Sequence, residues 1–169
     1  MAKQGAKGSG DAKKDEVQLI LKNRKLRHDY AVIDTYEAGM VLAGSEVKSL
    51  RNGDVQWGDA HARFDDRDGL LWLYGLHIGE YRQANTFGHK PLQPRRLLLN
   101  RAELEKLRGK MTTKGLTLVP DQLHFRRGWA KLVICLASGK DKGDRRRDLM
   151  TREAKRDVER EVARRAKQR

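Results

Sequence analysis

The sequence predicts a mainly β protein with short helices, folded as a closed antiparallel six-stranded OB-like β-barrel with flanking helices and a basic C-terminal tail. Apolar runs of strand length, separated by turn residues, recur about six times between residues 17 and 138. A chain of 169 residues with 38% hydrophobic content suits one modest domain with unpacked ends. An antiparallel barrel closes its own strand edges, although the strand pattern alone leaves a β-sandwich open.

Composition divides the chain into three parts. Residues 1–16 are rich in Gly, Lys, Ala and Asp without apolar periodicity, which predicts a disordered basic N-terminus. Residues 17–138 hold the barrel. Residues 139–169 carry thirteen basic and seven acidic residues and no aromatic residue. A narrow stripe of apolar residues, mostly small or β-branched, recurs there every four positions from Met150 to Ala166. Its burial is too weak to offset an ordering cost of ~1–2 kcal/mol per residue. We expect this tail to be disordered alone and helical on binding.

The charge of the chain indicates the kind of partner. A net charge of +14, from 37 basic and 23 acidic residues, predicts an anionic partner, with nucleic acid first and an acidic membrane surface second. No apolar run approaches the ~20 residues of a transmembrane helix, and the N-terminus lacks the apolar segment of a secretory signal. The single cysteine, Cys135, lies in an apolar run and forms no internal disulfide. These features predict a cytoplasmic protein without a membrane partner.

Catalytic and metal-binding patterns are not found in the sequence. It contains no Walker loop, no GxSxG, no HExxH and no paired Cys/His spacing. The five histidines are scattered, and no nucleophile–base pair follows from the spacing of the acids. We therefore predict no enzyme, no metal site and no cofactor. An RNA-processing enzyme that uses Glu37 or His28 is the open alternative.

The first half of the predicted barrel is organised around residues 37–51. The β-rich run 30–36 precedes Gly39, for which we predict a tight turn because glycine accepts a positive φ. The short apolar run 40–43 is typical of a second, buried strand. From Gly44 onward the spacing predicts a short helix, with Val47 and Leu50 on one face and two basic residues on another.

Two apolar runs across a polar turn predict a hairpin between residues 60 and 78. Leu70, Trp72, Tyr74, Leu76 and Ile78 share one face of its second strand, and Leu71 and Leu73 share the other. Because Trp72 and Tyr74 both flank leucines, we expect core positions for these two aromatic residues.

Residues 100–137 predict a helix followed by two strands. Asn100 suits an N-cap, with Glu103 three residues later, and Gly115 suits the helix end. The following strand contains Pro120, which predicts an edge or a bend. In the last strand Lys131 shares the face of Trp129, Val133 and Cys135, which places it at an exposed end or facing an anion.

Several motifs carry a resemblance to a known family. Residues 37–51, with 23–30 before them, closely resemble the SsrA-binding protein family (small protein B). The resemblance continues through residues 94–100, 115–120 and 139–140, followed by the triplet 144–146, and covers roughly residues 17–160. The family fold that it implies is a β-barrel with flanking helices, in agreement with the strand pattern.

The resemblance implies a function in ribosome rescue. Proteins of this family bind the tRNA-like domain of transfer-messenger RNA and deliver it, with elongation factor Tu acting through the aminoacylated RNA, to stalled ribosomes for trans-translation. The implied ribosomal contacts are small-subunit rRNA, the decoding centre and the empty mRNA channel, which the tail would enter. A monomer is expected.

The resemblance also implies roles for individual residues. Those expected to face the RNA are Asn23, Tyr30, Glu37, Leu98, Asn100 and Lys131. His28 would lie toward the decoding centre, and ribosomal engagement would fall to Asp144, Arg145, Arg146 and the helix after them. An acid at Glu37 is compatible with RNA because a carboxylate accepts hydrogen bonds from base amino groups. A structural role for Glu37, capping a turn, stays open.

Some positions depart from the family pattern, and one other binding function fits the composition. Gly143 stands where relatives often carry histidine or an aromatic residue, and Gln93 where arginine is frequent, which weakens one expected phosphate contact. Many relatives have Asp-Lys-Arg where this chain has arginine at position 145. The alternative function is a ribosomal or rRNA-maturation protein of OB-like fold that binds rRNA constitutively.

Overall fold

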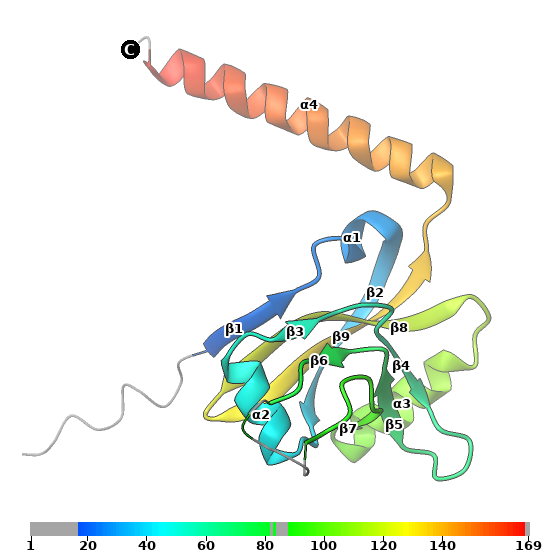
Figure 1. The fold of residues 1–169 in the computed structure, drawn as a ribbon. Coiled ribbons are helices and arrows are strands. Elements are labelled where there is room, and N and C mark those ends of the chain that lie inside the picture. Colours follow the sequence, from blue (N-terminus) through cyan, green and yellow to red (C-terminus); the bar gives the residue numbers. More distant parts are fainter. Residues whose placement is uncertain (1–16, 82, 84–87, 168–169) are drawn as a thin grey trace, which may run out of the picture.

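The computed structural model describes residues 17–81, 83 and 88–167. The segment 1–16, predicted to be disordered, lies outside the described residues. The described part is mainly β with short helices, as predicted, apart from one long helix at the C-terminus (Figure 1). Its elements in chain order are β1 (Val17–Lys22), α1 (Leu26–Asp29), β2 (Tyr30–Met40), α2 (Gly44–Arg51), β3 (Val55–Gln56), β4 (His61–Phe64), β5 (Leu71–Tyr74), β6 (His77–Ile78), β7 (Arg95–Leu98), α3 (Arg101–Met111), β8 (Leu116–Arg126), β9 (Trp129–Gly139) and α4 (Lys142–Lys167).

The strands pair antiparallel around one core. The main sheet has the order β1-β8-β4-β5-β7-β2-β9, and β9 also pairs with β8. β3 and β6 form a separate two-stranded sheet. Alternate residues of the strands face inward, so that Ala38, Leu73, Leu118, Leu132 and Ile134 are each 0% exposed. The described residues thus contain more strands than the six predicted, because β1, β3 and β6 lie outside the run from β8 through β4, β5, β7 and β2 to β9.

β2 continues through the position where the sequence predicted a turn. Gly39 pairs with Leu98 of β7 on one side and Lys131 of β9 on the other. Backbone hydrogen bonding on both sides keeps the chain extended until Met40. The prediction of a turn at Gly39 and a new strand at 40–43 is therefore wrong, whereas the helix predicted from Gly44 is confirmed as α2.

β5 presents the opposite face to the core from the one predicted. Leu71 and Leu73 are buried, whereas Trp72 and Tyr74 are half-buried and point outward. The run is apolar on both faces, so its alternation could not decide which face turns inward. The register decides it, because Trp72 lies between Arg63 of β4 and Arg96 of β7, two exposed residues.

The predicted bend at Pro120 is a bulge within a continuous strand. The register of β8 against β9 shifts between Pro120 and Gln122, and β8 continues to Arg126. The carbonyl of Pro120 accepts a hydrogen bond from Asn23 Nδ2 at 3.0 Å. The bulge thus connects β8 to the turn that precedes α1.

A polar cluster joins α3 to β2 and gives stability a pH dependence. Asp34 accepts hydrogen bonds from Lys110 Nζ and, at 3.0 Å, from the Tyr36 hydroxyl. The Lys110 bond first, and the Tyr36 bond next, lower the pKa of Asp34 below its ordinary value of 3.8. The bond to Asp34 raises the pKa of Lys110 above 10.5.

We expect the stabilising contribution of Asp34 to be fully present above pH 3.8 and lost as the pH falls from there through its lowered folded pKa. The contribution of Lys110 is present below pH 10.5 and lost as the pH rises through its raised pKa. Urea unfolding of the wild type and Asp34→Asn at a series of acidic pH values measures the first effect. The stability difference between the two proteins should shrink below pH 3.8. A difference that stays constant would show that Asp34 does not titrate with folding.

Candidate nucleic-acid interface

A row of residues crosses the outer face of three neighbouring strands. Leu98 of β7, Gly39 of β2 and Lys131 of β9 are successive register partners. Gly39 has no side chain, so Leu98 and Lys131 stand on either side of a low point in the sheet surface. Leu98 is 47% exposed, and Lys131 has no hydrogen bond or ion pair with any described residue. The row therefore offers a half-exposed ammonium group beside an apolar contact.

Glu37 lies on the same outer face, two residues before Gly39. Its carboxylate oxygens lie 3.5 Å from His124 Nε2 and 3.6 Å from Arg126 Nη1, and its side chain is 38% exposed. These neighbours hold the carboxylate in place while leaving part of it open as an acceptor. Because Glu37 is in the middle of β2, the alternative of a turn-capping role is wrong.

Asn100 extends this region beyond the end of β7. It occupies the N-cap position of α3, as predicted, with an extended backbone, but its side chain makes no capping hydrogen bond. The amide is exposed. It is thus available to a ligand on the side of the molecule where Leu98 lies.

An apolar groove of about 640 Å³ adjoins the row, and it contains an aromatic residue that was not among the predicted contacts. Gly39, Leu98 and Lys131 line it together with Trp129, which is 73% exposed. Trp129 follows a tight turn at Arg127 and Gly128, whose φ values are 52° and 79°. An exposed tryptophan two residues before a free lysine was the available signal, since aromatic rings stack on RNA bases. We name the surface formed by Glu37, Gly39, Leu98, Trp129 and Lys131 the lysine face.

The other two predicted RNA contacts lie elsewhere. Asn23 and Tyr30 line a second groove of about 820 Å³ with Lys22, Arg24 and Lys25. Asn23 already has structural partners, because its Oδ1 accepts from the Leu26 amide at 3.1 Å and its Nδ2 donates to Pro120. Tyr30 is half-buried against the small cluster of Leu26, Val119 and Cys135.

His28 lies where the tail leaves the body. It is exposed, and its Nδ1 is 2.8 Å from Asp29 Oδ1. The Lys140 amide donates to the Asp29 carbonyl at 2.9 Å, and Lys140 Nζ donates to the Arg27 carbonyl at 2.7 Å. α1 therefore fixes the start of the tail, and His28 stands beside it. We name this region, with Asn23, Tyr30 and α1, the tail root.

Asp144, Arg145 and Arg146 occupy the first turns of α4, which extends away from the sheet (Figure 1). Gly143 is in the same turn. Asp144 and Arg146 are exposed. Helix is the conformation we expect for the tail on binding, and its predicted disorder in the free protein stays a prediction.

The structure thus places the predicted contacts in two regions. β2 carries Tyr30 at the tail root and Gly39 in the lysine face, nine residues apart, which corresponds to about 30 Å of strand. Glu37, Leu98, Asn100 and Lys131 belong near the lysine face. Asn23, Tyr30, His28 and the tail belong to the other end.

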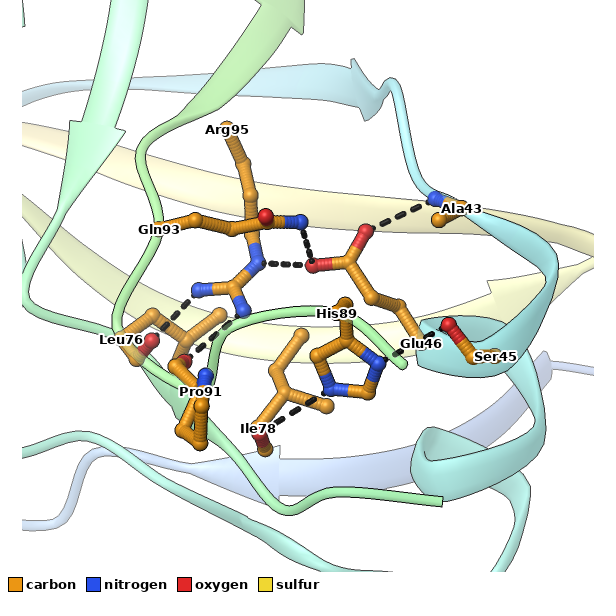
Figure 2. A network of polar contacts seen from close by, with 9 residues as sticks. All are labelled: Ala43, Ser45, Glu46, Leu76, Ile78, His89, Pro91, Gln93 and Arg95. Carbon is orange, nitrogen blue, oxygen red and sulfur yellow. Dashed lines mark hydrogen bonds and ion pairs between the residues drawn. The ribbon is translucent and has the colours of Figure 1, made fainter. Parts of the chain in front are cut away.

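A buried ion pair joins α2 to β7 and to the loop before it (Figure 2). Glu46 Oε1 lies 2.7 Å from Arg95 Nε, and the side chains are 2% and 1% exposed. Glu46 Oε2 also accepts from the Ala43 amide at 2.7 Å, and Arg95 Nη2 donates to the Pro91 carbonyl at 2.9 Å. Gln93 Nε2 donates to Glu46 at 2.9 Å. This glutamine, which stands where relatives often have arginine, therefore belongs to the buried network.

Other kinds of site find little support in the described part of the chain. No group of three His, Cys, Asp or Glu residues is placed to hold a metal ion among residues 17–81, 83 and 88–167. Cys135 is buried, and burial raises the pKa of its thiol, which disfavours the reactive thiolate. None of the described helices has the length and apolar character needed to cross a membrane.

Together, a net charge of +14, a free lysine beside an exposed tryptophan, and a basic helix projecting from a β body define a nucleic-acid-binding protein. Comparison with known proteins identifies the family. The family described as SmpB protein matches residues 20–164, and this chain belongs to it.

Similar proteins span nearly the whole chain. An SsrA-binding protein of Anaeromyxobacter sp. (strain K) is 49% identical over 158 residues, covering 94% of this chain and 96% of that protein. An SsrA-binding protein of Salinispora arenicola (strain CNS-205) is 50% identical over 150 residues, covering 89% and 93%. A chain of a solved structure described as "tmRNA-SmpB: a journey to the center of the bacterial ribosome" is 47% identical with a TM-score of 0.60, covering 72% of this chain and 85% of that one.

Proposed function

We propose that this protein binds the tRNA-like domain of transfer-messenger RNA and delivers it to stalled ribosomes for trans-translation. Family membership carries the proposal, because relatives about half identical over nearly the whole chain are SsrA-binding proteins. A constitutive rRNA-binding role is not favoured by these relatives. The protein acts as an adaptor without catalysis, as a monomer in the cytoplasm, and meets elongation factor Tu only through the aminoacylated RNA.

The two regions suggest a division of labour. The lysine face, with Glu37, Leu98, Asn100 and Lys131, binds the folded RNA by charge, an oriented acceptor and apolar contact. Asn23 and Tyr30 extend the contact toward the tail root. A surface of about 30 Å along β2 is long enough to lie against a substantial part of a tRNA-shaped domain.

The tail root and α4 serve the ribosome. His28 faces the decoding centre, while Asp144, Arg145, Arg146 and the rest of α4 enter the mRNA channel, which is lined by rRNA. If mRNA fills this channel, the tail has no site, so that discrimination is steric and electrostatic. Met150 and Val158 are 70% and 63% exposed, so helix α4 gains little from packing before it engages this channel. This supports a tail that becomes ordered on binding.

We also infer that the sheet is a closed six-stranded OB-like barrel. The pairing path from β8 through β4, β5, β7 and β2 to β9, with β9 paired again to β8, supports this inference. A closed path leaves few free strand edges, which suits a rigid platform for RNA.

Truncation after Asp141 tests the division of labour. It removes α4 but keeps the Lys140 contacts that fix the tail root. We expect the truncated protein to capture transfer-messenger RNA from cells as well as the full chain does, while tagging of proteins made from a message without a stop codon is lost. The measurements are sequencing of the co-purified RNA and detection of the degradation tag.

The full-length chain with Lys131→Glu is the matched control, which should lose the RNA and therefore the tag. Tagging that persists without α4 would contradict the role of the tail. Loss of RNA capture by the truncated protein would contradict the separation of body and tail. Stoichiometric association with one ribosomal subunit would instead favour the constitutive rRNA-binding alternative.

A further inference from the structure

Planar and cationic side chains gather on the outer face of β4, β5 and β7, and none of them is among the contacts assigned above. One of them, His61, also lines the groove of Asn23 and Tyr30. Arg63, Trp72 and Arg96 are successive register partners across the three strands. Two residues away on each strand, on the same face of the sheet, His61 is the register partner of Tyr74. Directly opposed residues of an antiparallel pair point to the same face, with Cβ atoms about 5 Å apart. We name the surface of His61, Arg63, Trp72, Tyr74 and Arg96 the aromatic platform.

The platform is ordered before any ligand binds. The His61 and Tyr74 rings stack with centroids 5.8 Å apart and planes inclined by 21°. The Arg63 guanidinium lies over the Tyr74 ring, 4.4 Å from its centroid. Trp72 Nε1 donates to Asp68 Oδ2 at 3.4 Å, which orients the indole. Four types of planar group are thus already held on one surface, so little side-chain freedom remains to be lost on binding.

The cationic groups of the platform are not neutralised within the described part of the chain. Neither the Arg63 nor the Arg96 side chain has a hydrogen bond or ion pair with another described residue, and both are exposed. Asp68 is the acid in contact with the platform, through Trp72. Exposed guanidinium groups on either side of an indole suit a ligand that has an anionic backbone and planar rings.

We propose that the aromatic platform is a further RNA-binding site, which stacks an unpaired base on its planar side chains while Arg63 and Arg96 contact the flanking phosphates. Bases splayed from loops or single strands stack on aromatic rings and guanidinium planes, whereas paired bases in a duplex hide their faces. The occupant is therefore a looped or single-stranded segment of RNA.

The platform is continuous with the lysine face. Leu98 lies two residues after Arg96 on the same outer face of β7 and is itself the partner of Gly39. An RNA held on the lysine face can thus continue over β7 onto β5. The proposal rests on the proposed function only in that the ligand is RNA, since its recognition elements are all distinct from the predicted contacts.

Cross-linking and matched variants test the platform. The full chain is titrated with a short, fluorescently labelled, U-rich single-stranded oligoribonucleotide, and a 5-iodouridine form of it is cross-linked and mapped by mass spectrometry. We expect cross-links at Trp72 or Tyr74 and about a tenfold loss of affinity for Tyr74→Leu, within the range that one stacked base contributes. Tyr74→Phe keeps the ring and should bind as the wild type does. Lys114→Gln, a charge loss on the turn after α3, should have little effect.

The outcomes separate this proposal from the proposed function. Cross-links confined to other surfaces, or unchanged affinity in Tyr74→Leu, would overturn the platform. If Tyr74→Leu does not fold, the cross-link map of the wild type decides. If the protein captures transfer-messenger RNA in cells but does not cross-link on β5, only the proposal of the aromatic platform is contradicted. If the protein cross-links on β5 but retains no transfer-messenger RNA, only the proposed function is contradicted.

Discussion

Replacing Lys131 by glutamate is expected to abolish tight binding to the tRNA-like domain, with an affinity loss of more than a hundredfold. The ammonium group stands beside Gly39 with no partner among the described residues, so its charge is available to a phosphate. Loss of one charged hydrogen bond costs about 1.5–3 kcal/mol, and the new carboxylate adds repulsion from the same phosphate. Glu37 on the neighbouring strand increases the local negative charge of the variant.

The test is a titration of labelled tRNA-like RNA at several salt concentrations. Lys131→Gln removes the charge without reversing it and should lower the magnitude of the log–log salt slope by about 0.7 if one single-stranded phosphate contact is lost. Lys114→Glu makes the same reversal on an exposed turn and should change affinity only slightly. Because Lys131 points out of the sheet, the thermal unfolding midpoint should stay close to that of the wild type. Unchanged affinity in Lys131→Glu would remove this residue from the interface.

Local sequence signals predicted the elements that depend on local physics. The helix opened by Gly44 and the N-cap position of Asn100 were both found where spacing placed them. The alternation of Lys131 with buried neighbours in β9 also follows from the two-residue period of a strand. Each of these features is set by residues within one turn or one strand.

The wrong predictions concern features that are determined by pairing between strands far apart in the sequence. Gly39 has the conformational freedom for a turn, but pairing with β7 and β9 keeps it extended, and those partners lie 59 and 92 residues further along the chain. Trp72 and Tyr74 sit in a run that is apolar on both faces, so only the register against Arg63 and Arg96 shows that they point outward. No local pattern contains that register.

The residues of the site were predicted, but their arrangement in space was not. The family resemblance supplied the candidate contacts, and the structure places them about 30 Å apart along β2, at the lysine face and the tail root. Trp129 was missed because its strand neighbours suggested an ordinary alternating position, whereas the tight turn at Gly128 leaves it at the exposed end of β9. The exposure of Trp129 depends on how the β8–β9 hairpin is oriented relative to the rest of the protein.

Breaking the Glu46–Arg95 pair from one side is expected to destabilise the fold by about 3–5 kcal/mol, because the remaining partner is left as an uncompensated buried charge. In Arg95→Met the Glu46 carboxylate keeps the Ala43 amide and the Gln93 amide but no cation. In Glu46→Gln the guanidinium keeps the carbonyls of Leu76 and Pro91 but no anion. Either loss is a large share of the 5–15 kcal/mol that holds a typical domain folded.

The double variant Glu46→Gln/Arg95→Met separates the pair from its members. Since neither charge remains, its unfolding free energy should fall by clearly less than the sum of the two single losses, and urea denaturation of all four proteins measures this coupling. RNA affinity, extrapolated to the folded fraction, should change far less than in Lys131→Glu, because the pair is buried between α2 and β7 (Figure 2). None of its printed hydrogen-bond partners belongs to the lysine face or the aromatic platform. A loss below about 1 kcal/mol in Arg95→Met would mean that water reaches Glu46 once the arginine is gone. The network would then orient the loop 89–95 without being needed for folding.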